Sequence, residues 1–417
     1  MNPMSMYNES LRAFLKPILA FLDDESVSEV MINGPADIWI ERKGRLQKTE
    51  AKFSEEGLMG AARNIAQYVG RPLSIERPRL DARLPDGSRI HVILSPVARQ
   101  GTTIAIRKFS KTRLTVAALV EEKSLSEPMV QLLTALIESK MNLVISGGTG
   151  SGKTSLLNIL STLIPEGERI LTIEDSAELQ LRQPHVVSLE TRPADVQGKG
   201  NVDMGDLLQS ALRLRPDRII VGEVRGGECF HLIQAMNTGH GGSMATTHAN
   251  TPVDTLRRLE SLSLMNLVEL PLVAARAQVA SAIQWIVCCE RVLDGSRKIT
   301  SIAEVLPLND KGEYRTQDIF VFSALGQTDQ GELMGYFAPT GIIPHSVYKL
   351  RSNGFSKLSD AFFDPLTYQV PPPPLFLLSE YSERQWAPSL AHRTRGELDS
   401  PHVEAERVAF RRKLQLH

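Results

Sequence analysis

The spacing of apolar residues divides the chain into two regions with different patterns. In the first region, short alternating runs are interleaved with two stretches of helical spacing, which is typical of a small α+β domain of roughly 110 residues. An Asp-Gly pair at 86–87 predicts a hairpin turn. The predicted elements are a helix over 9–25, strands over 27–32 and 37–42, a helix over 55–69, and strands over 81–84, 88–94 and 102–109.

From residue 129 onward the pattern changes to helices that alternate with short, continuously apolar strands. This alternation predicts a parallel sheet with crossover helices, so the second region is α/β. The longest apolar stretch, 270–289, is interrupted by polar residues and is interpreted as a buried helix and strand. The predicted strands of this region are 143–146, 170–173, 186–189, 219–221 and 242–247.

Composition narrows the class of protein. The chain has 417 residues and a net charge of −1, so no overall basic excess points to nucleic acid. Its three cysteines lack metal-ligand spacing and are expected to be reduced core residues, which suits a cytoplasmic protein. The N-terminus shows no signal-peptide pattern.

One glycine-rich turn carries the strongest chemical signal. The segment 147–154 reads Gly-Gly-Thr-Gly-Ser-Gly-Lys-Thr between an apolar strand and a helical pattern, which is the context that a phosphate-binding loop requires. Glycines let backbone N–H groups surround a phosphate, and the helix directs its positive end there. The predicted nucleotide-binding residues are Gly147, Gly148, Thr149, Gly150, Ser151, Gly152, Lys153, Thr154 and Ser155.

The predicted loop also indicates which of its residues would bind the phosphates and which would bind a metal ion. Lys153 is expected to bridge the β- and γ-phosphates of ATP, and the Thr154 hydroxyl is expected to hold Mg²⁺. The alternative, a flexible glycine loop without function, is disfavoured by the flanking strand and helix.

Three polar groups follow later strands, at the edge where open α/β sheets place their ligands. Glu174 follows the strand at 170–173, and Glu223 follows 219–221, where Gly222 occupies the usual Walker B aspartate position. His248 follows 242–247 and is a candidate γ-phosphate sensor. We interpret Glu174 as the general base that polarises water and Glu223 as a residue that positions Mg²⁺, with Glu223 as the alternative base.

Arginines are concentrated between 71 and 113. Guanidinium groups suit bidentate phosphate contacts and can neutralise a phosphoryl-transfer transition state. A solvated basic strand surface or a nucleic-acid face is the alternative. The region contains Arg71, Arg77, Arg79, Arg83, Arg89, Arg99, Arg107 and Arg113.

These motifs, in this order, resemble the ATPase superfamily of type II and type IV secretion, conjugation and type IV pilus systems. The resemblance covers roughly 10–363 and is closest to CpaF-like Flp/Tad pilus ATPases and TrbB-like conjugal transfer ATPases. It includes a Walker A motif, an Asp box, a glutamate-type Walker B motif and a His box. These lie at Gly147–Thr154, Thr172–Leu179, Ile219–Arg225 and Gly241–Pro252.

The resemblance implies a RecA-like ATPase domain behind the small N-terminal domain, in a homohexamer on the cytoplasmic side of an inner membrane. ATP hydrolysis would power pilus assembly or protein secretion through inner-membrane platform proteins, without direct nucleic-acid binding. Nucleotide would lie between the two domains of each chain. Among the arginines, it points to Arg83, Arg89 and Arg107 as the ones that approach the phosphates.

The expected domain organisation combines pattern and resemblance. A polar tail with a proline run at 371–374 follows the part that resembles the family, and we expect it to be a semi-rigid spacer and a largely disordered segment. The expected parts are an N-terminal domain (1–112), a linker (113–128), the ATPase domain (129–322), a C-terminal extension (323–364) and the tail (365–417).

Two other functions stay open at this stage. One is a nucleotide-gated scaffold with little turnover, which the presence of both acids and the histidine disfavours. The other is a DNA-transfer ATPase, which the neutral net charge and the lack of an aromatic-interleaved basic stretch disfavour.

Overall fold

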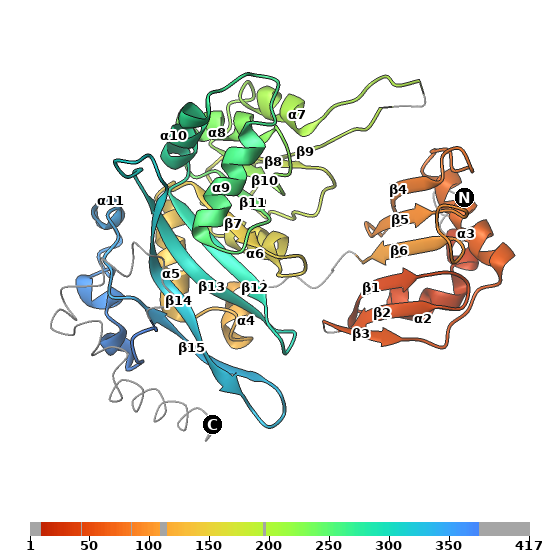
Figure 1. Ribbon diagram of the computed structural model, residues 1–417, viewed down its shortest axis with the longest axis horizontal. Coiled ribbons are helices and arrows are strands. Elements are labelled where there is room, and N and C mark those ends of the chain that lie inside the picture. The colour runs from red at the N-terminus through yellow and green to blue at the C-terminus, as the bar shows by residue number, and fades with distance from the viewer. Residues whose placement is uncertain (1–9, 43, 85, 109–114, 195–196, 375–417) are drawn as a thin grey trace. The chain divides into compact units, whose positions relative to one another are not determined.

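The computed structural model describes residues 10–42, 44–84, 86–108, 115–194 and 197–374. The chain divides into two compact units, Met1–Arg113 (unit 1) and Leu114–His417 (unit 2). Both appear in Figure 1, and each is described by itself. Among the described residues, no helix has the length and apolar character needed to cross a membrane.

Unit 1 is a six-stranded antiparallel sheet in the order β3-β2-β1-β6-β5-β4. Its core forms because the apolar face of α3, which begins at the N-cap Ser54, packs onto the buried alternate positions of the strands. Its elements are η1 (Lys16–Ile18), α2 (Leu19–Asp23), β1 (Val27–Ile32), β2 (Ile38–Arg42), β3 (Arg45–Lys48), α3 (Glu55–Tyr68), β4 (Arg79–Arg83), β5 (Arg89–Ile93) and β6 (Thr103–Arg107).

The predicted helix over 9–25 is not continuous. Helical residues end before Leu15, a 3-10 turn follows at η1, and α2 covers only Leu19–Asp23. Pro17 lies in η1 and has no N–H to donate, so an α-helix cannot run through this position without a break. The prediction of one continuous helix was wrong because it followed the helical spacing of the apolar residues. It did not allow for Pro17, which interrupts a helix.

Unit 2 is built on one nine-stranded sheet in the order β15-β14-β13-β12-β7-β11-β10-β8-β9. The six strands from β12 to β9 in this order are parallel, and the other three continue antiparallel from β12. Its strands are β7 (Leu143–Gly147), β8 (Ile170–Glu174), β9 (Val186–Glu190), β10 (Arg218–Val221), β11 (Met244–Thr247), β12 (Trp285–Arg291), β13 (Arg297–Leu306), β14 (Arg315–Gln327) and β15 (Leu333–Pro339).

Helices cover both faces of this sheet (Figure 1). On β7, Leu143 and Ile145 belong to one buried cluster, with α5, α6 and α11, whereas Val144 belongs to the other, with α7 to α10. A strand buried on both faces reads as continuously apolar, which is why the pattern indicated a parallel sheet. The helices are α4 (Val116–Glu121), α5 (Glu127–Glu138), α6 (Lys153–Ser161), α7 (Met204–Ala211), α8 (Cys229–Asn237), α9 (Pro252–Ser263), α10 (Leu272–Ala282), α11 (Val347–Ser352), η2 (Asp360–Phe363) and η3 (Pro365–Tyr368).

The C-terminal strands belong to the same sheet as the nucleotide loop. The boundary predicted at 322–323 therefore falls inside β14. The buried Glu304 of β13 accepts hydrogen bonds from the backbone N–H groups of His345 and Ser346, at 2.7 and 2.8 Å, and so fixes the start of α11 to the sheet. All three cysteines are free and buried, as expected from the sequence.

The proline run at 371–374 packs against the sheet rather than forming a spacer. All four residues are buried, and the Tyr336 hydroxyl of β15 donates to the Pro372 carbonyl at 3.4 Å. The remainder of the predicted tail, 375–417, lies outside the described residues.

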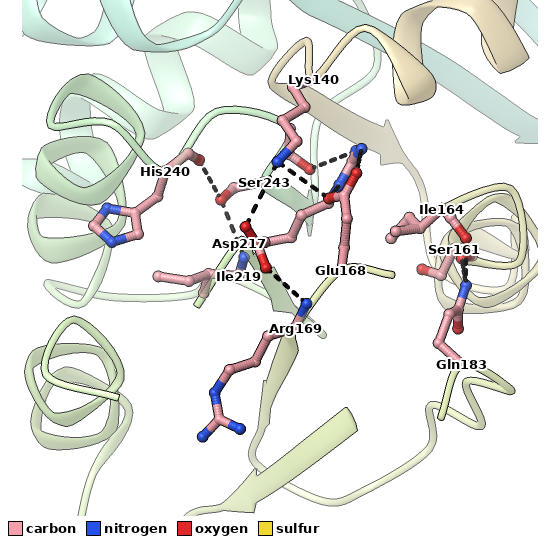
Figure 2. A network of polar contacts seen from close by, with 12 residues as sticks. Lys140, Ser161, Ile164, Glu168, Arg169, Gln183, Asp217, Ile219, His240 and Ser243 are labelled. Carbon is pink, nitrogen blue, oxygen red and sulfur yellow. Dashed lines mark hydrogen bonds and ion pairs between the residues drawn. The ribbon is translucent and has the colours of Figure 1, made fainter. Parts of the chain in front are cut away.

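A polar network joins the amino ends of the parallel strands, at the edge opposite the glycine-rich turn (Figure 2). The fully buried Arg218, which begins β10, makes a bidentate ion pair with Glu168, with Nε–Oε2 and Nη2–Oε1 distances of 2.6 and 3.0 Å. Lys140 Nζ lies 3.5 Å from Glu168 and 3.7 Å from Asp217. The Ser243 hydroxyl accepts from the Ile219 N–H and links β10 to the segment before β11.

This network generates a stability prediction. Glu168→Gln removes the charge that compensates Arg218, and we expect a loss of about 3 kcal/mol in the free energy of unfolding, because a buried cation left without its partner is costly. Urea unfolding measures the change. The control is Glu166→Gln two residues away, where the side chain is exposed and the expected change is below about 0.5 kcal/mol. Equal effects of the two variants would contradict the role assigned to the pair.

Candidate active site

The glycine-rich turn joins β7 to α6, as predicted. Gly147, which ends β7, is in close contact with β12: a Cβ at this position would lie 2.2 Å from the Cys289 carbonyl oxygen. Gly152 caps α6 in the left-handed region at φ +90°. Only glycine satisfies both requirements without strain. Gly148, Thr149 and Gly150 form the exposed part of the turn.

Lys153 is buried and its ammonium group lies inside the turn. Its Nζ donates to the carbonyl oxygens of Gly147 and Gly148 at 3.0 and 2.9 Å, and lies 3.4 Å from Nδ1 of His248. Thr154 follows on the first turn of α6 and is partly exposed, and Ser155 is exposed. The cation predicted to bind phosphate is therefore already positioned at the loop.

Glu223 and His248 meet beside Lys153. They follow β10 and β11, which are neighbours in the sheet, and His248 Nε2 lies 2.8 Å from Glu223 Oε1. Because Nδ1 of His248 faces the ammonium of Lys153, a neutral ring carries its proton on Nε2, toward Glu223. The structure thus brings together three of the predicted site residues in one chain of contacts.

The protonation states of these groups follow from their surroundings. Burial lowers the pKa of His248, and the positive charge of Lys153 lowers it further, against the attraction of Glu223. Burial alone would raise the pKa of Glu223, but the hydrogen bond from Arg225 and the charges of Arg225, His248 and Lys153 outweigh it, so this pKa is lowered. At neutral pH the site holds a neutral imidazole between an ammonium and a carboxylate.

Glu174 ends β8, and its carboxylate is almost fully buried at 3% exposure. Oε1 accepts hydrogen bonds from the backbone N–H groups of Glu178 and Leu179, at 2.9 and 3.1 Å, so this side chain shapes the segment that follows β8.

The position of Glu174 also explains the missing Walker B aspartate. A Cβ on Gly222 would lie 2.9 Å from Cγ and 3.3 Å from Oε1 of Glu174. The space that an aspartate side chain would need at position 222 is therefore taken by the carboxylate of the neighbouring strand.

Arg225 is a site residue that carried no role in the sequence prediction. Its Nη2 donates to Glu223 Oε2 at 2.6 Å, and its Nη1 lies 3.7 Å from Asp175. The hydroxyl of Thr246 donates to the Gly222 carbonyl at 2.7 Å, which holds the backbone before Glu223 in place. Arg225 lies within the Walker B motif recognised in the sequence, and a charged residue two positions after the acid was the available signal.

The three predicted arginines lie in unit 1, on neighbouring strands. Arg83 of β4 is the register partner of Arg89 of β5, which in turn is the partner of Arg107 of β6. The buried positions Ile90 and Ile106 alternate with them, so the arginines occupy the face opposite the core. This arginine row continues onto β1, where Glu29 is the register partner of Arg107 and its Oε1 lies 3.9 Å from Arg107 Nε. Like charges directly opposite each other on a sheet repel, and an opposite charge beside them offsets that repulsion.

Comparisons with known proteins place the chain in a family. The family described as "Type II/IV secretion system protein" matches residues 13–309. A putative conjugal transfer protein of Mycobacterium tuberculosis is 33% identical over 317 residues, which cover 74% of this chain and 88% of the relative. The conjugal transfer protein TrbB of Rhizobium radiobacter is 36% identical over 281 residues, with 66% and 83% covered.

Among solved structures, the VirB11 ATPase of the Brucella suis type IV secretion system, crystallised with sulphate, is 30% identical. That similarity covers 72% of this chain and 95% of VirB11, with a TM-score of 0.38. Since the family match spans well over half of the chain and includes the nucleotide loop, both acids and the histidine, the chain belongs to the type II/IV secretion ATPase superfamily.

Proposed function

We propose that this chain is a Mg²⁺-dependent ATP hydrolase that assembles into a homohexamer and powers pilus assembly or protein secretion from the cytoplasmic side of an inner membrane. The observation that carries the proposal is the contact chain from Lys153 through His248 to Glu223 beside the phosphate-binding loop. A loop without catalytic function would not require a cation, an imidazole and a carboxylate in sequence at its mouth.

Substrate binding follows from the groups in the loop. The γ- and β-phosphates of ATP replace the carbonyl oxygens of Gly147 and Gly148 as partners of Lys153, and the N–H groups of the loop and of α6 surround the β-phosphate. His248, neutral and within reach of Lys153, donates from Nε2 to the γ-phosphate and so senses its presence.

The donor set fits a magnesium ion. The Thr154 hydroxyl would hold the ion directly and the Glu223 carboxylate would hold it through water, and both are the hard oxygen groups that Mg²⁺ prefers. The described residues contain no group of three or more His, Cys, Asp or Glu side chains that would hold a metal by themselves. That composition suits an ion held mainly by phosphate oxygens and water. When bound, Mg²⁺ neutralises charge on the phosphates during the reaction.

The contacts favour Glu223 over Glu174 as the general base. Glu223 is partly open to solvent and faces His248, whereas the Glu174 carboxylate is buried and accepts from two backbone N–H groups. In the proposed step, Glu223 takes a proton from water, the water oxygen bonds to the γ-phosphorus, and the bond to the β–γ bridging oxygen breaks, which releases phosphate and ADP. The activation of water by Glu174 stays the alternative.

The assembly part of the proposal rests on the arginine row of unit 1. Arg83, Arg89 and Arg107 provide adjacent guanidinium groups that suit a triphosphate. The relatives named for conjugal transfer support a second candidate, in which the same ATPase serves DNA transfer. Stimulation of hydrolysis by DNA would favour that candidate over pilus assembly or protein secretion.

The first prediction concerns assembly. Specific Mg²⁺-dependent phosphate release is expected to rise with protein concentration, because a site completed by neighbouring chains is active only in the assembly. Lys153→Ala should reduce release to background. A phosphate assay across a dilution series, with light scattering for assembly size, measures both. Binding of ATP with no release under any condition would support the nucleotide-gated scaffold instead.

In the same assay, Arg89→Ala tests whether the arginine row affects turnover specifically or only through the loss of a surface charge. We expect a loss of about 10³-fold in turnover, at the lower end of what a transition-state arginine contributes. Arg79→Ala is the matched control, since Arg79 is an exposed arginine of β4 whose register partner is Ile93 rather than an arginine. Similar losses in the two variants would remove the proposed role of the row.

The second prediction distinguishes the two acids. Glu223→Gln is expected to reduce turnover by about 10²- to 10⁴-fold and to leave ATP binding intact, as for loss of a general base. Glu174→Gln weakens the acceptor of two backbone N–H groups, so we expect its main effect on thermal stability. Turnover and melting temperature are measured for both. If Glu174→Gln loses turnover while Glu223→Gln keeps it, the base assignment is reversed.

The third prediction concerns pH. Because the pKa of His248 is lowered, the folded state binds fewer protons at this ring than the unfolded chain, and stability should fall as the pH drops below 6.5, the ordinary histidine value. His248→Asn should flatten this part of the stability profile. Melting temperatures between pH 7.5 and pH 5.5 at fixed ionic strength provide the measurement, and parallel profiles for variant and wild type would contradict it.

A further inference from the structure

The β12–β13 hairpin carries an arginine onto the phosphate-binding loop. Arg297, the first residue of β13, donates from Nε to the Gly150 carbonyl at 3.1 Å. A Cβ on Gly152 would lie 2.9 Å from Arg297 Cδ, so the aliphatic part of the arginine lies directly over Gly152. Among the described residues, Arg297 makes no ion pair with a carboxylate. Its polar contact is with the loop.

This contact fixes the orientation of one peptide group. The Gly150 carbonyl and the Ser151 N–H belong to the same planar unit and point in opposite directions. The carbonyl is held by Arg297, while the Ser151 N–H turns into the loop and lies 3.4 Å from the Gly148 carbonyl oxygen. A backbone N–H that faces the loop interior is what a bound phosphate needs.

Arg297 and Lys153 therefore hold different parts of the loop. Lys153 contacts the carbonyls of Gly147 and Gly148, which it must leave to bind phosphate in the proposed function. Arg297 contacts Gly150 from β13, so it keeps the loop in shape while Lys153 moves.

The position of Arg297 is in turn fixed by the C-terminal strands. Its register partner on β12 is Arg291, and the turn between them is closed by Asp294, which accepts from the Ser296 N–H at 2.8 Å. The second oxygen of Asp294 accepts from the N–H of Leu333, the first residue of β15, at 2.7 Å. The β14–β15 hairpin thereby holds the turn that presents Arg297.

We propose that Arg297 is a positioning residue that keeps the peptide between Gly150 and Ser151 oriented for the β-phosphate, with the β12–β13 turn fixed to β15 through Asp294. The proposal deepens the proposed function and rests on it, since it concerns how the same loop binds nucleotide. It adds a residue of the C-terminal meander to a site otherwise formed by β7, β8, β10, β11, β12 and α6.

Nucleotide affinity tests this role. In Arg297→Gln we expect the dissociation constants of Mg²⁺·ADP and of a non-hydrolysable ATP analogue to rise equally, by about tenfold, because both ligands carry the phosphate that the loop binds. In steady-state hydrolysis, KM should rise more than kcat falls. Titration calorimetry and phosphate release measure the two effects. A purely structural role would lower the melting temperature without this equal change in affinity.

A matched control tests whether the effect is specific to Arg297, and a second variant covers the case in which the first does not fold. Arg315→Gln removes another arginine whose Nε donates to a main-chain carbonyl, that of Pro307 at 2.8 Å, but away from the loop, and its affinities should stay unchanged. If Arg297→Gln does not fold, Arg297→Lys keeps the charge and stem but lacks the Nε donor, and the same equal loss is expected.

The outcomes are distinct. Wild-type affinities in the Arg297 variants would overturn the proposal, and so would a loss for the ATP analogue without a loss for ADP, which would indicate a γ-phosphate contact. If the wild-type protein itself binds neither ligand, the proposed function fails, and the role of Arg297 in nucleotide binding fails with it. Equal losses for both ligands, with an unchanged control, support it.

Discussion

The approach of β12 to Gly147 is the constraint on which the site depends. The Cys289 carbonyl leaves no room for a side chain at Gly147, so the pairing of these two parallel strands requires glycine where the loop begins. That pairing sets the position of the loop relative to β13 and hence the position of Arg297 above Gly150. Substituting Gly147 would therefore disturb both the nucleotide loop and its contact with the C-terminal strands.

The two edges of the parallel strands have different chemistry. At the carboxyl edge, Glu223, His248 and Lys153 form a partly exposed chain of contacts beside the glycine-rich turn. At the amino edge, Arg218 and Glu168 form a buried bidentate ion pair that stabilises the sheet (Figure 2).

The sequence predicted the parts of the site that are local. The loop, the two acids and the histidine each follow an apolar strand in a short motif, and parallel topology brings strand ends together, so their meeting could be expected. The predicted hairpin around 86–87 is confirmed by the antiparallel pairing of β4 with β5, but the register that sets Arg83 opposite Arg89 was not predicted. The helix break at Pro17 could also have been predicted, since proline interrupts an α-helix.

The rest depends on packing between distant segments. Glu174 reaches Gly222 because β8 and β10 pair in a particular register, with Ile173 opposite Val221, and no local pattern reports that register. Arg297 is separated from Gly150 by 147 positions along the chain, and its motif is an ordinary strand start. The packing of the proline run on β15 could likewise not be predicted from the sequence, because its composition alone suggests an exposed segment.

The arginine row of unit 1 has a consequence for how this unit responds to dissolved ions. Three guanidinium groups on adjacent strands repel one another most strongly in dilute buffer, where the screening length reaches about 30 Å, and much less at 0.1 M salt, where it is about 10 Å. Added electrolyte should therefore weaken the repulsion within the row, and it also screens the attraction between Arg107 and Glu29. This face of unit 1 is for that reason sensitive to the ionic strength of the buffer.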